Sequence, residues 1–145
     1  MAESIVALSL AANVVQFIDF GSRLATQFWS FYKSSSKALF HPDLDQINID
    51  LQRVLTELQV PLCQTNSGVE QLVGDCHKIS MELDLVLRSL SEAKASSTRD
   101  ALKAAFKAVW KEDEIKAFQE RLDRFRAQLN LHLLTIIRWV APTQN

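Results

Sequence analysis

Basic side chains recur at every fourth position in the segment RDALKAAFKAVWK, residues 99–111. Positions four apart share one side of an α-helix, so these cations form a stripe beside an apolar face. A basic amphipathic helix with a tryptophan is typical of helices that bind a membrane surface or a partner protein. The alternative is an ordinary surface helix whose aromatic side chains belong to the core. The candidate lipid- or partner-binding residues are Arg99, Lys103, Phe106, Lys107, Trp110 and Lys111.

The histidines and cysteines form no catalytic or metal-binding pattern. Cys63 and Cys76 belong to no C-x-x-C pair, and the neighbours Cys76 and His77 would point about 100° apart on a helix. The chain also contains no glycine-rich phosphate-binding motif. We therefore expect a protein that is not an enzyme and uses no metal or cofactor. We expect reduced cysteines and a partly buried His132.

The N-terminal segment SIVALSLAANVVQFI, residues 4–18, has no charged side chain. As a helix it would be about 22 Å long, shorter than the roughly 30 Å hydrocarbon core of a bilayer. No Lys or Arg precedes Arg23, which argues against a secretory signal. A helix that is apolar nearly all round is expected to be covered by neighbours in the centre of a bundle.

The same segment is also a candidate for membrane insertion, because a helix at a chain end can leave a bundle. With Asp19 and Arg23 at the interface, it would supply about 20 apolar residues, enough to span a bilayer. The candidate insertion residues are Ile5, Val6, Leu8, Leu10, Val14, Val15, Phe17, Ile18 and Phe20.

Composition and apolar spacing predict the fold class. Apolar residues make up 48% of the 145 residues, and the scarcity of turn residues, Gly 3 and Pro 3, favours helices. We expect an all-α protein, an antiparallel bundle of four to five helices around a central apolar N-terminal helix. One domain would cover residues 1–145, with helices at 4–33, 43–64, 67–94, 98–110 and 112–140. The net charge of -1 offers no general attraction to nucleic acid.

Three segments have apolar residues at spacings of three and four, which is the helical period. The second expected helix carries Leu44, Ile47, Leu51, Val54, Leu58 and Leu62, with Pro61 expected to kink or end it. The third carries Val69, Leu72, Cys76, Ile79, Leu83, Val86 and Leu90, after a capping box of Ser67 and Glu70. The last carries Ile115, Phe118, Leu122, Phe125, Leu129, His132, Ile136 and Trp139. Leu133, Ile137 and Val140 widen this stripe, so we expect the C-terminal end to be deeply packed.

Three phrases of the sequence resemble a known family. MAESIVALSLAANVVQFIDFGSRL, FYKSSSKAL and ERLDRFRAQLNLHLL are similar to the HeLo-like N-terminal domains of fungal NLR-type receptors. The resemblance implies a helical bundle similar to the four-helix executioner domain of mammalian necroptosis. It also implies a cell-death effector, cytoplasmic at rest, whose N-terminal helix permeabilises the plasma membrane after the receptor oligomerises. Some relatives have glycines in that helix, whereas the first glycine here is Gly21.

Two functions follow as hypotheses. In the first, the chain is a membrane-targeting effector domain, and its partners are anionic lipid, further copies of itself, and a nucleotide-binding module or partner receptor. In the second, it is a non-catalytic interaction module that relays the state of a receptor through helix docking, without lipid contact.

Overall fold

The computed structural model describes residues 2–33, 43–58, 68–94 and 99–140, and these residues form helices and their caps. The helices are α1 (Ala2–Lys33), α2 (Leu44–Glu57), α3 (Val69–Lys94), α4 (Arg99–Val109) and α5 (Glu112–Val140). No strand occurs in these ranges. The expected all-α helical bundle is therefore confirmed.

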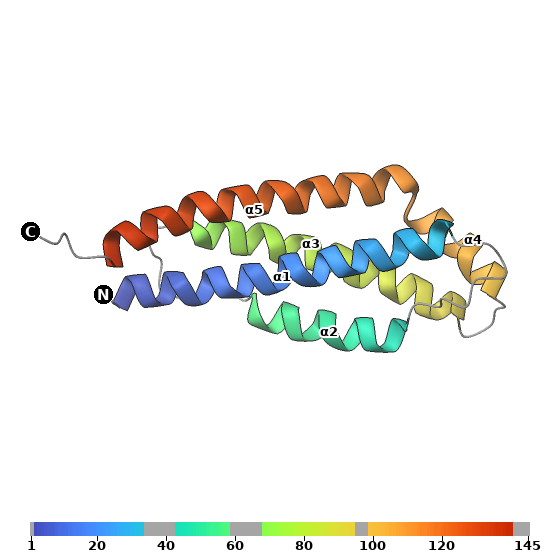
Figure 1. Cartoon of the computed structure of the whole chain (residues 1–145). Coiled ribbons are helices and arrows are strands. Elements are labelled where there is room, and N and C mark those ends of the chain that lie inside the picture. The colour runs from blue at the N-terminus through green and yellow to red at the C-terminus, as the bar shows by residue number, and fades with distance from the viewer. Residues whose placement is uncertain (1, 34–42, 59–67, 95–98, 141–145) are drawn as a thin grey trace, which may run out of the picture.

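The four longer helices run along one axis, and α4 lies at the end of the bundle where α1 finishes (Figure 1). α1 runs antiparallel to α2 and α5 and parallel to α3. α1, the expected central helix, contacts each of the other four helices, most extensively α5, and α3 also contacts all four. Because α1 and α5 are antiparallel, the start of α1 and the end of α5 lie at the same end of the molecule.

The core follows the helical spacing of the sequence. The buried side chains of α2 are those at the predicted positions Leu44, Ile47, Leu51 and Val54, and Leu58 after the helix is buried too. On α3, Leu87 is buried, whereas the predicted Val86 is only half-buried. On α5, the predicted stripe is buried at Ile115, Phe118, Leu122, Phe125, Leu129 and Ile136, and His132 is half-buried as expected.

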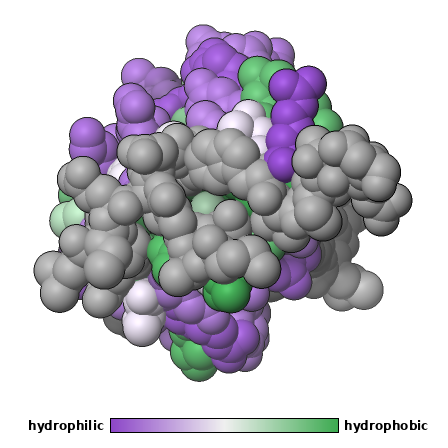
Figure 2. All heavy atoms as spheres, turned by 90° about the vertical axis from the view of Figure 1, so that its left-hand side faces the viewer, coloured by the Kyte–Doolittle hydropathy of each residue, from purple (hydrophilic) through white to green (hydrophobic). Residues whose placement is uncertain are grey.

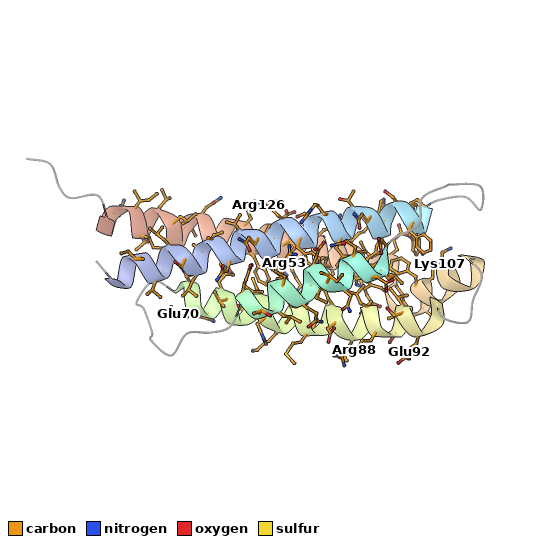
Figure 3. The ribbon with its side chains drawn as sticks, turned by 90° about the horizontal axis from the view of Figure 1, so that it is seen from below. Arg53, Glu70, Arg88, Glu92, Lys107 and Arg126 are labelled. Carbon is orange, nitrogen blue, oxygen red and sulfur yellow. The ribbon has the colours of Figure 1, made fainter. Side chains whose placement is uncertain are left out.

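α2 is shorter than predicted. Its first turn is capped by Asp43, whose carboxylate accepts a hydrogen bond from the N–H of Gln46 at 3.1 Å. It ends at Glu57, and the N–H of the capping Leu58 donates to the carbonyl of Val54 at 3.0 Å. The predicted end at residue 64 is therefore wrong, because Leu58 already lies outside the helix. Pro61, Leu62 and Cys63 lie outside the described residues. Figures 1 and 3 show α1 and α5 continuing past this end of α2.

The remaining helix ends agree with the prediction to within two residues. Gly68 precedes α3 with φ 80, a left-handed conformation that favours glycine. A Cβ at Gly68 would lie 2.6 Å from Cε1 of His132, so this end of α3 packs directly against α5. The predicted capping residue Ser67 lies outside the described residues.

The C-terminal end of α5 is not deeply packed, which corrects the prediction. Ile137 is 55% exposed, and Leu131 and Leu134 on the same helix are also exposed, while Leu133 is half-buried. The apolar residues here are too numerous for one helix face, and only one face of α5 meets the bundle. The side chains of Trp139 and Val140 lie outside the described residues.

Candidate functional site

The nine candidate insertion residues of α1 lie on different faces of the helix. Five of them are buried in the bundle: Leu10, Val14, Phe17, Ile18 and Phe20. Val6 is half-buried and packs against the core. Ile5, Leu8 and Val15 are exposed, so the expectation that neighbours cover α1 on all sides is wrong.

The exposed side of α1 changes character along the helix. Ile5, Leu8, Ala12 and Val15 are exposed at spacings of three and four, which places them on one side. The exposed residues that continue this side are polar: Asp19, Arg23, Thr26 and Ser30. The first half of α1 therefore presents an apolar strip to the surroundings.

α5 carries a second apolar strip, and of its residues only Ile137 was predicted to be packed. It consists of Leu131, Leu134 and Ile137, at spacings of three. Residues 127–137 contain no Asp, Glu, Lys or Arg. A signal was present in the sequence for two of them, since Leu131 and Leu134 lie roughly opposite the buried stripe that includes Phe118, Leu122 and Leu129. Figure 2 views this end of the molecule and shows hydrophobic residues reaching the surface among hydrophilic ones.

The candidate binding residues of α4 are divided between core and surface. Phe106 and Trp110 are buried. Their rings lie 4.9 Å and 5.5 Å from that of Phe28, centroid to centroid, in a cluster that also includes Phe118. The prediction of a binding role for Phe106 and Trp110 is therefore corrected, because their rings are buried and hold α4 against α1 and α5.

The basic half of the stripe reaches solvent where the structure describes it. Lys107 and Lys111 are exposed, and Figure 3 labels Lys107 at the α4 end of the bundle. The side chains of Arg99 and Lys103 lie outside the described residues.

A group of lysines and aromatic rings joins α1, α4 and α5 at this end. The rings of Trp29 and Tyr32 stack with centroids 6.2 Å apart. Lys33 lies 4.8 Å from the centre of Trp29, and Lys107 lies 4.9 Å from the centre of Tyr32. Lys116 lies 5.8 Å from the centre of Trp29. We call these five residues the lysine–aromatic corner.

One carboxylate accompanies the corner. Oε1 of Glu112 is 3.4 Å from Nζ of Lys33 and 3.9 Å from Nζ of Lys116. These lysines are more than half exposed, so each pair contributes at most about 1 kcal/mol. Three ammonium groups against one carboxylate leave the corner with a positive charge, which favours an anionic surface.

The corner and the apolar start of α1 lie at opposite ends of the bundle (Figure 1). α1 has 32 residues, which at 1.5 Å per residue separates its ends by about 48 Å. A flat membrane that met the bundle end-on would therefore contact one of these surfaces and not the other.

A further hollow lies away from the corner, in the described part of the chain. The hollow between α3 and α5 holds about 310 Å³ and is lined by Trp110 and Phe118, with Arg121 and Glu82 paired at 3.6 Å. No group of three His, Cys, Asp or Glu side chains that could hold a metal occurs among the described residues. Burial raises the pKa of the Cys76 thiol to about 12, with a smaller contribution from Asp75, so this thiol is protonated at neutral pH.

Comparisons with protein-family models, curated proteins and solved structures found no match to this chain.

Proposed function

We propose that the chain is a membrane-permeabilising effector domain, in line with the cell-death domains that its sequence resembles. α1 would pack in the bundle while the protein is cytoplasmic, and would insert into the plasma membrane after several copies assemble. The observation that carries the proposal is the composition of α1. Residues Ile5–Lys33 are long and apolar enough to cross a bilayer, and only 44% of the most apolar window is buried in the bundle.

The energetics favour direct transfer of α1 from the bundle to lipid. The large apolar side chains that α1 buries in its described part are Leu10, Val14, Phe17, Ile18, Phe20, Leu24, Phe28 and Phe31. At about 1.5–3 kcal/mol each, their exposure to water would cost about 12–24 kcal/mol. A typical domain has a net stability of about 5–15 kcal/mol, so release into water would unfold the protein. Hydrocarbon removes this cost, because it solvates the same side chains.

Release of α1 also uncovers the apolar faces of α3 and α5, which pack against it in the bundle. Copies of the domain held close together can cover these faces for one another. The proposal therefore couples insertion to self-association, with a nucleotide-binding module or partner receptor supplying the local concentration.

The test uses an exposed position of α1, because a charge there is tolerated in the bundle and opposed by the bilayer. Val15 is 42% exposed and lies within the uncharged segment, one turn before Asp19. A lysine costs about 2.5–3.5 kcal/mol at the bilayer centre and less toward the interface, so Val15→Lys should lower membrane insertion severalfold. Ser30→Lys is the matched control, since it adds the same charge at an exposed position of α1 beyond the apolar half.

Each protein is fused to an inducible oligomerisation module, and dye release is measured from vesicles of phosphatidylcholine and phosphatidylserine. Circular dichroism and thermal melting establish that the variants remain folded. We expect release by the parent chain and by Ser30→Lys, and a loss with Val15→Lys. Equal release by all three would contradict insertion of α1. No release by any of them would favour the interaction module that works without lipid.

A further inference from the structure

Two pairs of residues place the apolar strips and the lysine–aromatic corner on one side of the molecule. Val15 and Lys33 are eighteen residues apart on α1, which is five turns at 3.6 residues per turn. Leu134 and Lys116 are also eighteen residues apart, on α5. Residues separated by whole turns lie on one line along a helix. Because Lys33 and Lys116 both meet Glu112, the two lines run along the same side of the α1 and α5 pair.

The change from polar to apolar surface occurs at a similar level on both helices. A Cβ at Gly21 would lie 3.0 Å from Cδ1 of Leu122, which sets the register of α1 against α5. A charged residue borders each apolar strip on the side of the corner. On α1 this residue is Asp19, which follows the strip in the sequence, and on α5 it is Arg126, which precedes the strip. Both are close to that contact, two and four residues away. The two strips therefore begin side by side and continue toward the same end.

The surface between the strips and the corner carries charges of both signs. Asp19 and Arg23 are the exposed charged residues of α1 there, and on α5 Glu120 is exposed one turn from Lys116, followed by the ion pair of Asp123 and Arg126 at 3.2 Å. We name the whole surface the α1–α5 face. It consists of Leu8, Val15, Leu134 and Ile137 at one end, this polar band, and Trp29, Lys33 and Lys116 at the other.

We propose that the α1–α5 face docks the folded bundle lengthwise on an anionic membrane, before α1 is released. The apolar strips enter the outer part of the hydrocarbon, and the corner lies among the phosphate headgroups. The inference rests on the proposed function and adds α5 to it. It assigns Leu134 and Ile137 a role in lipid binding that is separate from the insertion of α1.

The composition and extent of the face favour lipid as its occupant. Its two ends are about 27 Å apart along the axis, and a membrane surface contacts both at once. Tryptophan beside lysine is the pairing found at the boundary between hydrocarbon and water, where an indole ring and an ammonium group each find a suitable environment. The positive charge of the corner complements anionic headgroups. Lengthwise docking also lays the whole of α1 along the membrane that it is proposed to enter.

The test replaces apolar residues of α5, which the release of α1 does not require. Leu134 and Ile137 are 61% and 55% exposed, so the double variant Leu134→Glu, Ile137→Glu leaves the core intact. The matched control is Met81→Glu, Leu85→Glu on α3, where the exposed fractions are 55% and 64%. Binding of the unfused domain is measured by co-sedimentation with vesicles of phosphatidylcholine and phosphatidylserine in a 7:3 ratio, and with phosphatidylcholine alone.

We expect the α5 variant to bind the anionic vesicles at least tenfold more weakly, and the α3 control to bind within twofold of the parent chain. A second pair of variants tests the corner. Lys33→Gln, Lys116→Gln should weaken binding to anionic vesicles and lower its salt dependence, whereas Lys78→Gln, Arg88→Gln on α3 should do so much less.

Three results would overturn the inference. The first is equal binding by the α5 variant and the α3 control, and the second is no binding of the unfused parent chain. The third is a parent chain that sediments as a dimer in the absence of lipid while the α5 variant is a monomer, because the face would then bind a second copy. None of these results decides the proposed function, which the dye release of the oligomerised chain tests separately.

Discussion

The side chain of Asn13 on α1 donates a hydrogen bond from Nδ2 to the backbone carbonyl of Glu57, the last residue of α2, at 2.8 Å. The last carbonyls of a helix have no partner within the helix, so this amide supplies one from a neighbour. Oε2 of Glu57 is buried and has no hydrogen-bond partner in the described part of the chain. Glu57 also lines a hollow between α1 and α2 whose other residues are mostly polar, among them Gln16 and Arg53. The hydrogen bond joins the apolar half of α1 to the C-terminal end of α2.

Replacement of Asn13 should loosen α1. Asn13→Ala leaves the Glu57 carbonyl without this donor, and we expect the free energy of unfolding to fall by about 1–2 kcal/mol. Urea denaturation followed by circular dichroism measures the change. Asn130→Ala, at an exposed position of α5, is the control and should change stability by less than about 0.5 kcal/mol. A similar loss in both variants would argue against a specific role for the Asn13 bond.

Two glycines inside helices should respond to substitution with opposite signs. A Cβ at Gly21 would meet Leu122 at 3.0 Å and Phe118 at 3.2 Å, whereas a Cβ at Gly74 would meet nothing within 4 Å. Gly21→Val should destabilise the bundle by about 1–3 kcal/mol, because it forces α1 away from α5. Gly74→Ala should stabilise it by about 0.5–1 kcal/mol, because alanine restricts the unfolded chain and favours helix. Thermal melting distinguishes them, and a stabilised Gly21→Val would show that α1 and α5 can separate without loss.

Substitution of Gly68 should be destabilising for two reasons that can be separated. The left-handed backbone costs an L-residue about 1–2 kcal/mol, and the new Cβ must displace the ring of His132. We expect Gly68→Ala to lower the free energy of unfolding by about 2 kcal/mol or more. In the background of His132→Ala, the cost should shrink to the backbone contribution. Equal costs in the two backgrounds would mean that the ring moves aside freely.

The thiol of Cys76 should be unreactive in the folded protein. Burial raises its pKa from the ordinary 9.0 to about 12, so the thiolate forms far more easily in the unfolded chain. With Cys63 replaced by serine, labelling with iodoacetamide at pH 8 should follow unfolding, and denaturant should accelerate it strongly. Fast labelling without denaturant would show that α3 opens locally.

The same pKa shift predicts how stability depends on alkaline pH. A pKa that is higher in the folded state stabilises the protein fully below pH 9 and loses that contribution as pH rises toward about 12. Relative to Cys76→Ala, the parent chain should lose up to about 1.4 kcal/mol per pH unit in this range. Parallel pH profiles for the two proteins would contradict a buried, protonated thiol.

Many features of the fold could be predicted because helical spacing is a local property. The positions of Leu44, Ile47, Leu51 and Val54 identified the buried side of α2 before any neighbour was known. The end of the same helix could not be predicted as well, because the apolar spacing continues to Leu62 while the helix ends at Glu57. Val60 precedes Pro61, and a residue before proline disfavours the helical conformation, so the local signal against a longer helix was stronger than the spacing suggested.

The sequence by itself determined that the chain forms helices, which residues of α2 and most of those of α3 and α5 face the core, and that α1 is uncharged over residues 4–18. These properties depend on the period of the α-helix and on side-chain chemistry. Only the tertiary structure decided which apolar residues remain exposed. In a bundle, even the central helix α1 has neighbours on some sides and an open side, so Val14 is buried while the adjacent Val15 is exposed. The packing of α1 against α5 then placed Val15 and Leu134 on the same side of the molecule as Lys33 and Lys116, a relationship that no single helix contains.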